Sequence, residues 1–336
     1  MATSNAYSQD EEYINNMLAL LKPKLTEVYK GTTVRRDAHP KCLGLLKAEF
    51  VVEQNIPENL KVGVFAEPRT YSALIRMSNA SGHIQSDKVK DIRGFAIKLL
   101  GVAGERYSQA EKTTQDFLLI NYPVIPIGTV KLFHDFVYYS VKFHPLLFIL
   151  KLLFTGKGKI VKQLQEASQN HTSLLDIRFW STTPYQLGTQ AIKFSIVPTS
   201  NYRSALPNPL TDNYLTTNAQ QHLDTAEATF DFMVQLQTNK NSMPIDDAGV
   251  EWQESESPYI KVATLRIPKQ IFDTPERFEL AEHLSFSPEH ALEVHKPLGS
   301  LNRARYIIYR QISEFRHQKN TKSLIEPNEE LFKKIV

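Results

Sequence analysis

The spacing of hydrophobic positions first predicts a helix at the N-terminus. Apolar residues recur at helical intervals in the run YINNMLALL, which follows Ser8 and Glu11 at the S-x-x-E spacing of a capping box. We expect this helix to begin near Ser8 and to end or kink at Pro23, because proline cannot donate a hydrogen bond inside a helix. Residues 1–30 are therefore predicted to form an N-terminal helix.

From about Leu45 to Asn121 the pattern changes to strands. Short β-rich segments are separated by turns of Gly, Pro, Asn and Asp, in GLLKAEFVVE, TYSALIRMSNA, GFAIKLLGV and DFLLINY. Further strands are predicted in QAIKFSIVP, ATFDFMVQLQ and YIKVATLRIP, and helices in PERFELAEHL and from Asn302 onward. Strands without βαβ alternation, with helices at both ends of the chain, predict an α+β fold with an antiparallel sheet or barrel.

A helical stretch interrupts the strands at 129–170. Its most apolar part, 129–154, is interrupted by lysines and by Asp135, so no uncharged run reaches the roughly 18 residues that a membrane span requires. Pro145 divides it into two amphipathic helices. Two interpretations stay open: a helical hairpin packed on the core, or an interfacial face that contacts a membrane or handles lipids.

Composition excludes several classes of protein. Of the 336 residues 42% are hydrophobic, which suffices for a folded core, and a net charge of +3 spread along the chain gives no basis for nucleic-acid binding. The N-terminus has no secretory pattern, and the single cysteine, Cys42, cannot form an intramolecular disulfide. Both features favour a cytoplasmic location. Cys42 is either a buried structural thiol or a redox-sensitive one.

Most common catalytic motifs are missing. The sequence contains no GxxxxGK[ST] phosphate loop, no HExxH and no GxSxG, and Gly156-Lys-Gly158-Lys lacks both the first glycine and the hydroxyl residue of a phosphate loop. No two of the ten histidines have a convincing spacing for metal ligands on a helix. The sequence therefore gives little support to a metal site made of protein ligands alone.

The C-terminal helix carries one informative stripe. At about 100° per residue Arg305, Tyr309, Ile312 and Arg316 share a face, with Asn302 as the expected N-cap. A solvated amphipathic helix would show this stripe too. The functional alternative is that Arg305 holds Tyr309 as a phenolate that ligates a metal, while Arg316 meets an anion.

A second constellation combines His39 with a predicted strand. In that strand Ser72, Leu74, Arg76 and Ser78 share one face, and Tyr71, Ala73, Ile75 and Met77 share the other. Arg76 and Ser78 could serve an anion and a histidine. Taken alone, His39 before Pro40 is more typical of a structural or exposed histidine.

Together these segments resemble the haem catalase superfamily. The similar motifs keep the family's order from about Thr32 to Arg316: Arg36-x-x-His39-x-Lys41, Ile75-Arg76-Met77-Ser78, Asp91-Ile-Arg93-Gly94-Phe95-Ala96-Ile97-Lys98, Leu284-Ser-Phe286-Ser-Pro288 and Arg305-x-x-x-Tyr309 with Arg316. The chain is much shorter than a standard catalase. The runs AHPKCLGLLKAEF and HKPLGSLNRAR resemble the small catalase-related haem proteins, which include peroxidase-like members and allene oxide synthases.

The resemblance implies a catalase-like antiparallel β-barrel with a helical insertion and a C-terminal proximal helix. It implies a haem-binding domain over 31–320, interrupted by the 129–170 insertion and followed by a tail at 321–336. The implied cofactor is haem b, with Tyr309 as the iron ligand and Arg305 as its charge partner. His39 would be the distal acid and base, oriented by Ser78. The residues implied to pair with the haem propionates are Arg36, Arg76 and Arg316.

The sequence departs from the family at the implied distal side. A catalytic asparagine is expected where Thr114 stands, Asp37 and Ala38 precede the histidine where valines are usual, and an aromatic residue is expected near Ile127. Loss of a preorganised amide donor weakens the case for fast dismutation of hydrogen peroxide.

Three functions follow as hypotheses. The first is a haem peroxidase or weak catalase that cleaves the O–O bond of hydroperoxides. The second is an allene-oxide-synthase-like enzyme that rearranges fatty-acid hydroperoxides, and the third is a haem-binding protein without turnover. A peroxide or lipid hydroperoxide is the implied substrate, peripheral membrane contact through 129–154 is an option, and the oligomeric state stays open.

Overall fold

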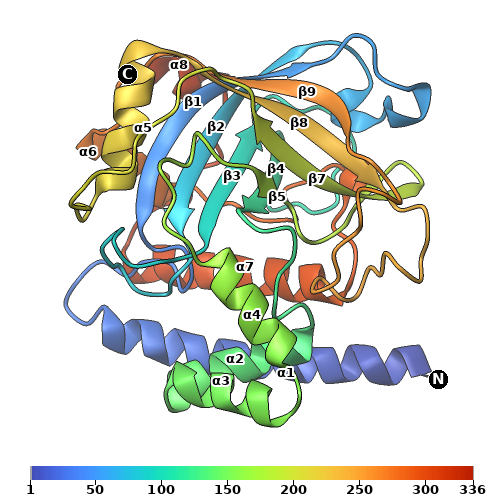
Figure 1. The fold of residues 1–336 in the computed structure, drawn as a ribbon, viewed down its shortest axis with the longest axis vertical. Helices are drawn as coiled ribbons and strands as arrows, with labels where there is room; N and C mark the ends of the chain where they lie inside the picture. Colours follow the sequence, from blue (N-terminus) through green and yellow to red (C-terminus); the bar gives the residue numbers. More distant parts are fainter. Residues whose placement is uncertain (1, 336) are drawn as a thin grey trace.

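The computed structural model describes residues 2–335, and side chains from residue 9 onward. Its centre is a β-barrel made of antiparallel strands (Figure 1). The strands are β1 (Cys42–Val52), β2 (Thr70–Asn79), β3 (Arg93–Leu99), β4 (Gln115–Ile120), β5 (Phe179–Trp180), β6 (Tyr185–Leu187), β7 (Gln190–Pro198), β8 (Ala228–Leu236) and β9 (Ile260–Ile267).

Pairing between β5 and β7 closes the barrel. The order β5-β4-β3-β2-β1-β9-β8-β7 returns to β5, and β6 pairs with β7 outside this ring. The predicted α+β fold with an antiparallel barrel is therefore confirmed. Closure leaves no unpaired edge among these eight strands, which is the usual way for an antiparallel sheet to avoid pairing with other chains.

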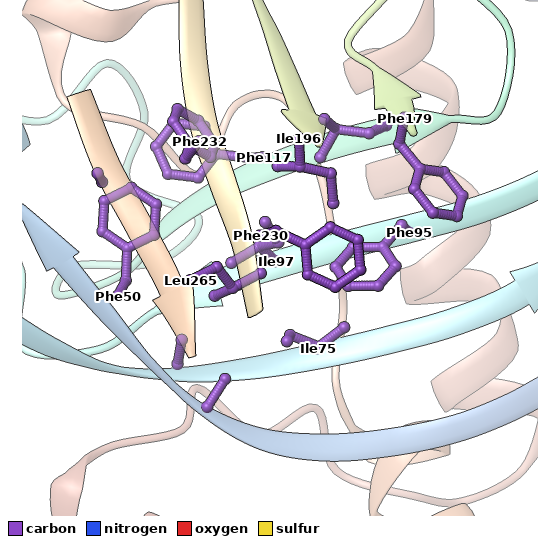
Figure 2. Close-up of a cluster of buried hydrophobic side chains, with 14 of the residues drawn as sticks. Phe50, Ile75, Phe95, Ile97, Phe117, Phe179, Ile196, Phe230, Phe232 and Leu265 are labelled. Atoms are coloured by element: carbon purple, nitrogen blue, oxygen red, sulfur yellow. The ribbon is translucent and has the colours of Figure 1, made fainter. Parts of the chain in front are cut away.

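Alternation along the strands fills the barrel with aromatic and branched side chains, so its interior is a packed core (Figure 2). Phe50, Phe117 and Phe232 lie in mutual ring contact there. The inward residues of β2 include Ile75 and Met77, whereas Arg76 and Ser78 point outward, as the predicted faces require. Any binding site must then lie outside the barrel.

Helices cover that outer surface: α1 (Ala2–Val28), α2 (Val130–Lys142), α3 (Pro145–Phe154), α4 (Gly158–Ala167), α5 (Tyr214–Thr225), α6 (Pro275–His283), α7 (Ser300–Lys319) and α8 (Glu329–Lys334). In Figure 1, α7 lies between the barrel and the layer formed by α1 and α2. The helices α2, α3 and α4 occupy most of 129–170. None of the helices in residues 2–335 has the length and apolar character needed to cross a bilayer.

The predicted start of the N-terminal helix is wrong. Helix α1 begins at Ala2, so Ser8 lies inside it and the Ser8 side chain falls outside the described residues. Pro23 lies within the same helix, so of the two predicted outcomes, an end or a kink, the end is wrong. The apolar residues that flank Pro23, including Leu21 and Leu25, are buried against α2 and α7, so tertiary packing outweighs the lost backbone hydrogen bond.

The start of α7 also differs from the prediction. Gly299 has a φ of 84°, and a Cβ atom there would lie 2.5 Å from the carbonyl oxygen of Ile245, so only glycine fits. The helix therefore begins at Ser300, and Asn302 lies inside its first turn. There the Asn302 amide donates to the carbonyl of Pro184 at 2.8 Å, which ties the start of α7 to the barrel.

Candidate functional site

A cavity of about 600 Å³ separates the outer face of the barrel from α7. Its barrel wall comes from outward positions of β2, β3 and β4, and its other wall from α7 and α2. This volume falls within the range of roughly 300–1,000 Å³ typical of small-molecule sites. All the predicted site residues except Thr114 line the cavity: Arg36, His39, Arg76, Ser78, Arg305, Tyr309 and Arg316.

The loop before β1 presents His39 to this cavity. Its Nδ1 lies 2.9 Å from the hydroxyl oxygen of Ser78, and its carbonyl oxygen accepts a hydrogen bond from Arg76 at 2.8 Å. His39 has a φ of 57°, which is uncommon for a residue with a side chain. Its ring also lies against Gly94, where a Cβ atom would come within 2.7 Å of the imidazole. The histidine is thus held in one orientation.

Its surroundings keep His39 neutral. Burial lowers its pKa to about 3, and the positive charges of Arg76 and Arg305 contribute to the same shift. At neutral pH the imidazole is therefore uncharged. It can accept a proton and then return it as a strong acid.

On the opposite wall, α7 brings Arg305 and Tyr309 together. The guanidinium Nε lies 3.5 Å from the tyrosine hydroxyl, and Nη1 donates to Thr183 at 2.8 Å. Burial acts to lower the pKa of Arg305, but the neighbouring Tyr309 and Tyr185 raise it above its ordinary value. Arg305 therefore carries a permanent positive charge next to the Tyr309 oxygen.

The remaining arginines gather around one buried carboxylate. Glu282, from α6, accepts from Arg36 at 2.9 Å and from Arg316 at 3.2 Å, and Arg35 lies 3.5 Å away. Although burial opposes ionisation, these guanidinium groups lower the pKa of Glu282 to about 2. We call Arg35, Arg36, Arg76, Arg316 and Glu282 the arginine cluster.

Within this cluster only Arg76 keeps a buried donor free. Its Nε is buried and has no hydrogen-bond partner among the described residues. Arg36, by contrast, also donates to the carbonyl oxygens of Ala281 and Leu284. Arg76 is 4% exposed, and the cavity is the place where an anion could meet it.

Thr114 lies elsewhere. It is fully buried, its hydroxyl donates to the carboxylate of Glu111, and it does not line the cavity. Lys98 pairs there with Glu111 and with Asp116, and His290 lies 2.8 Å from Asp116. We call Lys98, Glu111, Thr114, Asp116 and His290 the lysine cluster. It borders the cavity only through His290.

Glu282 is the main site residue that sequence reasoning missed. It stands in the predicted helix PERFELAEHL with nothing in its spacing to link it to Arg36 or Arg316. No sequence signal marked it, because Glu282 lies on a short helix without a pronounced apolar face. Of the residues that depart from the catalase pattern, Asp37, Ala38 and Ile127 do line the cavity.

Comparison with known proteins reveals the fold only. No protein-family model matches the chain, and no curated protein matches its sequence. Among solved structures, a fungal catalase matches with a TM-score of 0.69 and 14% identity over 87% of this chain and 62% of the catalase. A bacterial catalase gives 0.66 and 14%, covering 90% and 62%, and catalase A from Saccharomyces cerevisiae gives 0.69 and 15%, covering 90% and 67%.

The chain thus has a catalase-like fold and spans about 62% of the length of the first two catalases. At 14–15% identity the likeness says nothing about activity. Function must be argued from the cavity itself.

Proposed function

We propose that this protein is a haem-dependent enzyme that cleaves the O–O bond of hydroperoxides. One observation carries the proposal: a single cavity has the neutral, oriented His39 on its barrel wall and the Arg305–Tyr309 pair on its helix wall. Storage of a cofactor needs no acid or base, so the oriented imidazole favours an enzyme over a haem-binding protein without turnover.

The residues fit haem b. Tyr309 offers a phenolic oxygen to iron, and the positive charge of Arg305 lies beside it. Arg76 offers an unpartnered buried guanidinium nitrogen to a propionate. Apolar side chains such as Leu118 and Val137 cover much of the remaining wall. Arg36 and Arg316 already share Glu282, so their role would be to supply positive potential near a propionate.

In this proposal the protein moves one proton. A bound haem would supply the electron density that breaks the O–O bond. His39 would take the proton from one peroxide oxygen and return it to the departing oxygen. Ser78 would hold Nδ1 so that the other ring nitrogen faces the substrate.

The cavity wall supports an organic hydroperoxide as a second candidate substrate. Phe133, Phe136 and Val137 of α2 line it, and Thr114 contributes no polar group to it. An apolar wall suits a fatty-acid hydroperoxide, which an allene-oxide-synthase-like enzyme would rearrange without external reductant.

Turnover by the haem-loaded protein tests these functions. Hydrogen peroxide and a polyunsaturated fatty-acid hydroperoxide would be supplied in turn without reductant, and oxygen and lipid products would be measured. Oxygen from hydrogen peroxide would identify a catalase, and rearranged lipid with little oxygen a lipid-processing enzyme. Turnover that appears only with an added organic donor would identify a peroxidase.

The His39→Ala variant provides the control. We expect it to bind haem and to lose most of its reactivity with hydroperoxides. Equal reactivity in His39→Ala and the unaltered protein would contradict the proposal and favour a haem carrier.

A further inference from the structure

The helix α3 exposes an apolar face that no other part of the described chain covers. The solvent-facing residues of α3, together with the adjoining Phe143, form what we call the apolar tip. Its members are Phe143, Leu146, Leu147, Leu150, Leu153 and Phe154. Phe154 is 88% exposed and Phe143 59%. Single exposed hydrophobic residues are ordinary, but a contiguous set on one element marks a contact surface.

The periodicity of α3 shows that this face is distinct from its packing face. The five helical members of the tip fall within an arc of about 120°, whereas the buried Phe148 and Leu152 lie on the opposite side. The helix is thus apolar almost all round. Such helices are normally enclosed by protein or by lipid, and here only half of the surface is enclosed by protein.

Positive charge surrounds the tip. The sequence from 130 to 165 contains six lysines and one acidic residue, Asp135, which is already paired with Lys151 at 2.9 Å. The side chains of Lys142, Lys157 and Lys159 are exposed and form no ion pair within residues 9–335. An apolar face with a lysine rim matches the surface of a bilayer that contains anionic lipids.

We propose that the apolar tip docks this protein on an anionic lipid bilayer. A second copy of the chain fits the same surface poorly, because a two-fold contact would bring the two lysine rims against each other. In Figure 1, α2 and α3 lie at the edge of the molecule away from the barrel, where a flat surface can reach them.

The tip is also continuous with the cavity. Pro145, the first residue of α3, lines it together with Val141 and Phe136 of α2. A docked molecule would therefore hold this wall of the cavity against the bilayer, where fatty-acid hydroperoxides reside. This last step rests on the proposed function, whereas docking itself does not.

Flotation with lipid vesicles tests docking without any turnover. The full-length protein would be mixed with vesicles of phosphatidylcholine alone or with phosphatidylglycerol added. We expect binding to the anionic vesicles, weakened by high salt, and at least about tenfold less binding by the double variant Leu146→Ser/Phe154→Ser. The matched control, Leu206→Ser/Ile271→Ser, replaces exposed apolar residues elsewhere and should bind as the unaltered protein does.

Two further measurements separate docking on anionic lipid from association between copies of the chain. The variant Lys157→Gln/Lys159→Gln should lose much of the preference for anionic vesicles. Sedimentation velocity without lipid should show the same oligomeric state for the unaltered protein and the tip variant. Absence of vesicle binding, equal loss in the control variant, or an oligomer that the tip variant abolishes would each overturn the proposal. Turnover measured separately distinguishes its failure from failure of the proposed function.

Discussion

The lysine cluster and the arginine cluster lie along the same outer face of the barrel but have different charge balances. Lys98, at 0% exposure, contacts both Glu111 and Asp116, and the nearby Arg106 supplies a second positive charge. Glu326 adds a third carboxylate near Arg106, so the positive charges of this cluster are fully compensated. In the arginine cluster four guanidinium groups surround Glu282, and the additional carboxylate of Asp37 still leaves a surplus of positive charge.

We interpret this difference as that between a structural cluster and the proposed binding site. Burial of a charge costs several kcal/mol unless a partner compensates it, so the lysine cluster, whose cations face carboxylates, needs no ligand. The arginine cluster has a surplus of positive charge beside a cavity and an unpartnered Nε on Arg76, so it could accept an anion from outside. The unpartnered Nε and Nη1 of Arg106, by contrast, lie among carboxylates. Both clusters contain residues of the catalase-like motifs, so membership of a motif alone does not identify a functional residue.

The largest expected effect on the free energy of unfolding comes from a substitution in the lysine cluster. Lys98→Met leaves the buried carboxylates of Glu111 and Asp116 without their main counter-charge. We expect it to lower the free energy of unfolding by about 3–5 kcal/mol, measured by denaturant titration. Lys261→Met, which removes a partly exposed lysine paired with Glu53 and Asp231, should cost about 1 kcal/mol or less. Equal losses would contradict the structural role of the lysine cluster.

Removal of a charge from the arginine cluster should also lower the stability of the protein, but haem should restore it. Glu282→Gln removes the central negative charge and should lower the free energy of unfolding by about 2–3 kcal/mol. Under the proposed function, bound haem would bring two propionates to the same arginines, so it should stabilise this variant more than it stabilises the unaltered protein. Thermal unfolding with and without haem measures the difference. Similar recovery by haem in Lys98→Met would remove the distinction between the clusters.

A third variant replaces Arg76, whose Nε has no hydrogen-bond partner among the described residues. Arg76→Met removes a buried, incompletely bonded guanidinium, so we expect little loss of stability and about tenfold weaker haem binding. Titration of the protein with haem, followed by absorbance, gives the affinity. Unchanged affinity would mean that Arg76 does not meet a propionate.

The last expected effect is small per pH unit and concerns the pH dependence of stability. The pKa of His39 is about 3 in the folded protein, below its ordinary value of 6.5, so between these values the unfolded chain binds a proton that the folded chain does not. Stability contributed by neutral His39 is present above pH 6.5 and is lost as the pH falls towards 3. The loss should reach up to about 1 kcal/mol per pH unit, because His39 is partly exposed to the cavity. His39→Gln should have a shallower profile in urea titrations, and an identical slope would contradict the shift.

Much of the fold could be predicted from local patterns. Period-2 alternation predicted β8, and turns of glycine, proline, asparagine and aspartate separated the segments that form β1 to β4. The short strands β5 and β6 were not predicted. Helix α5 was missed, although Leu215, Ala219 and Leu223 have helical spacing and are buried. The predicted starts of α1 and α7 were wrong. Packing carries α1 past Pro23, and the backbone of Gly299 decides where α7 begins.

The site was less accessible to sequence reasoning. Helical and strand periodicity linked Arg305 to Tyr309 and Arg76 to Ser78, and the structure places these pairs on facing walls of one cavity. Glu282 could not be linked to the arginines, because that contact joins α6 to residues far away in sequence. Alignment of Thr114 with the catalytic asparagine gave a position in sequence, but its hydroxyl lies in the lysine cluster.

The central claim is that Tyr309 and Arg305 hold haem in the cavity that His39 faces. Its most direct test is the absorption spectrum of the haem-loaded protein compared with that of Tyr309→Phe, with Tyr306→Phe on the same helix as the control. We predict that the unaltered protein and Tyr306→Phe bind one haem with the spectrum of a tyrosinate ligand, and that Tyr309→Phe loses this spectrum. An unchanged spectrum and affinity in Tyr309→Phe would contradict the account.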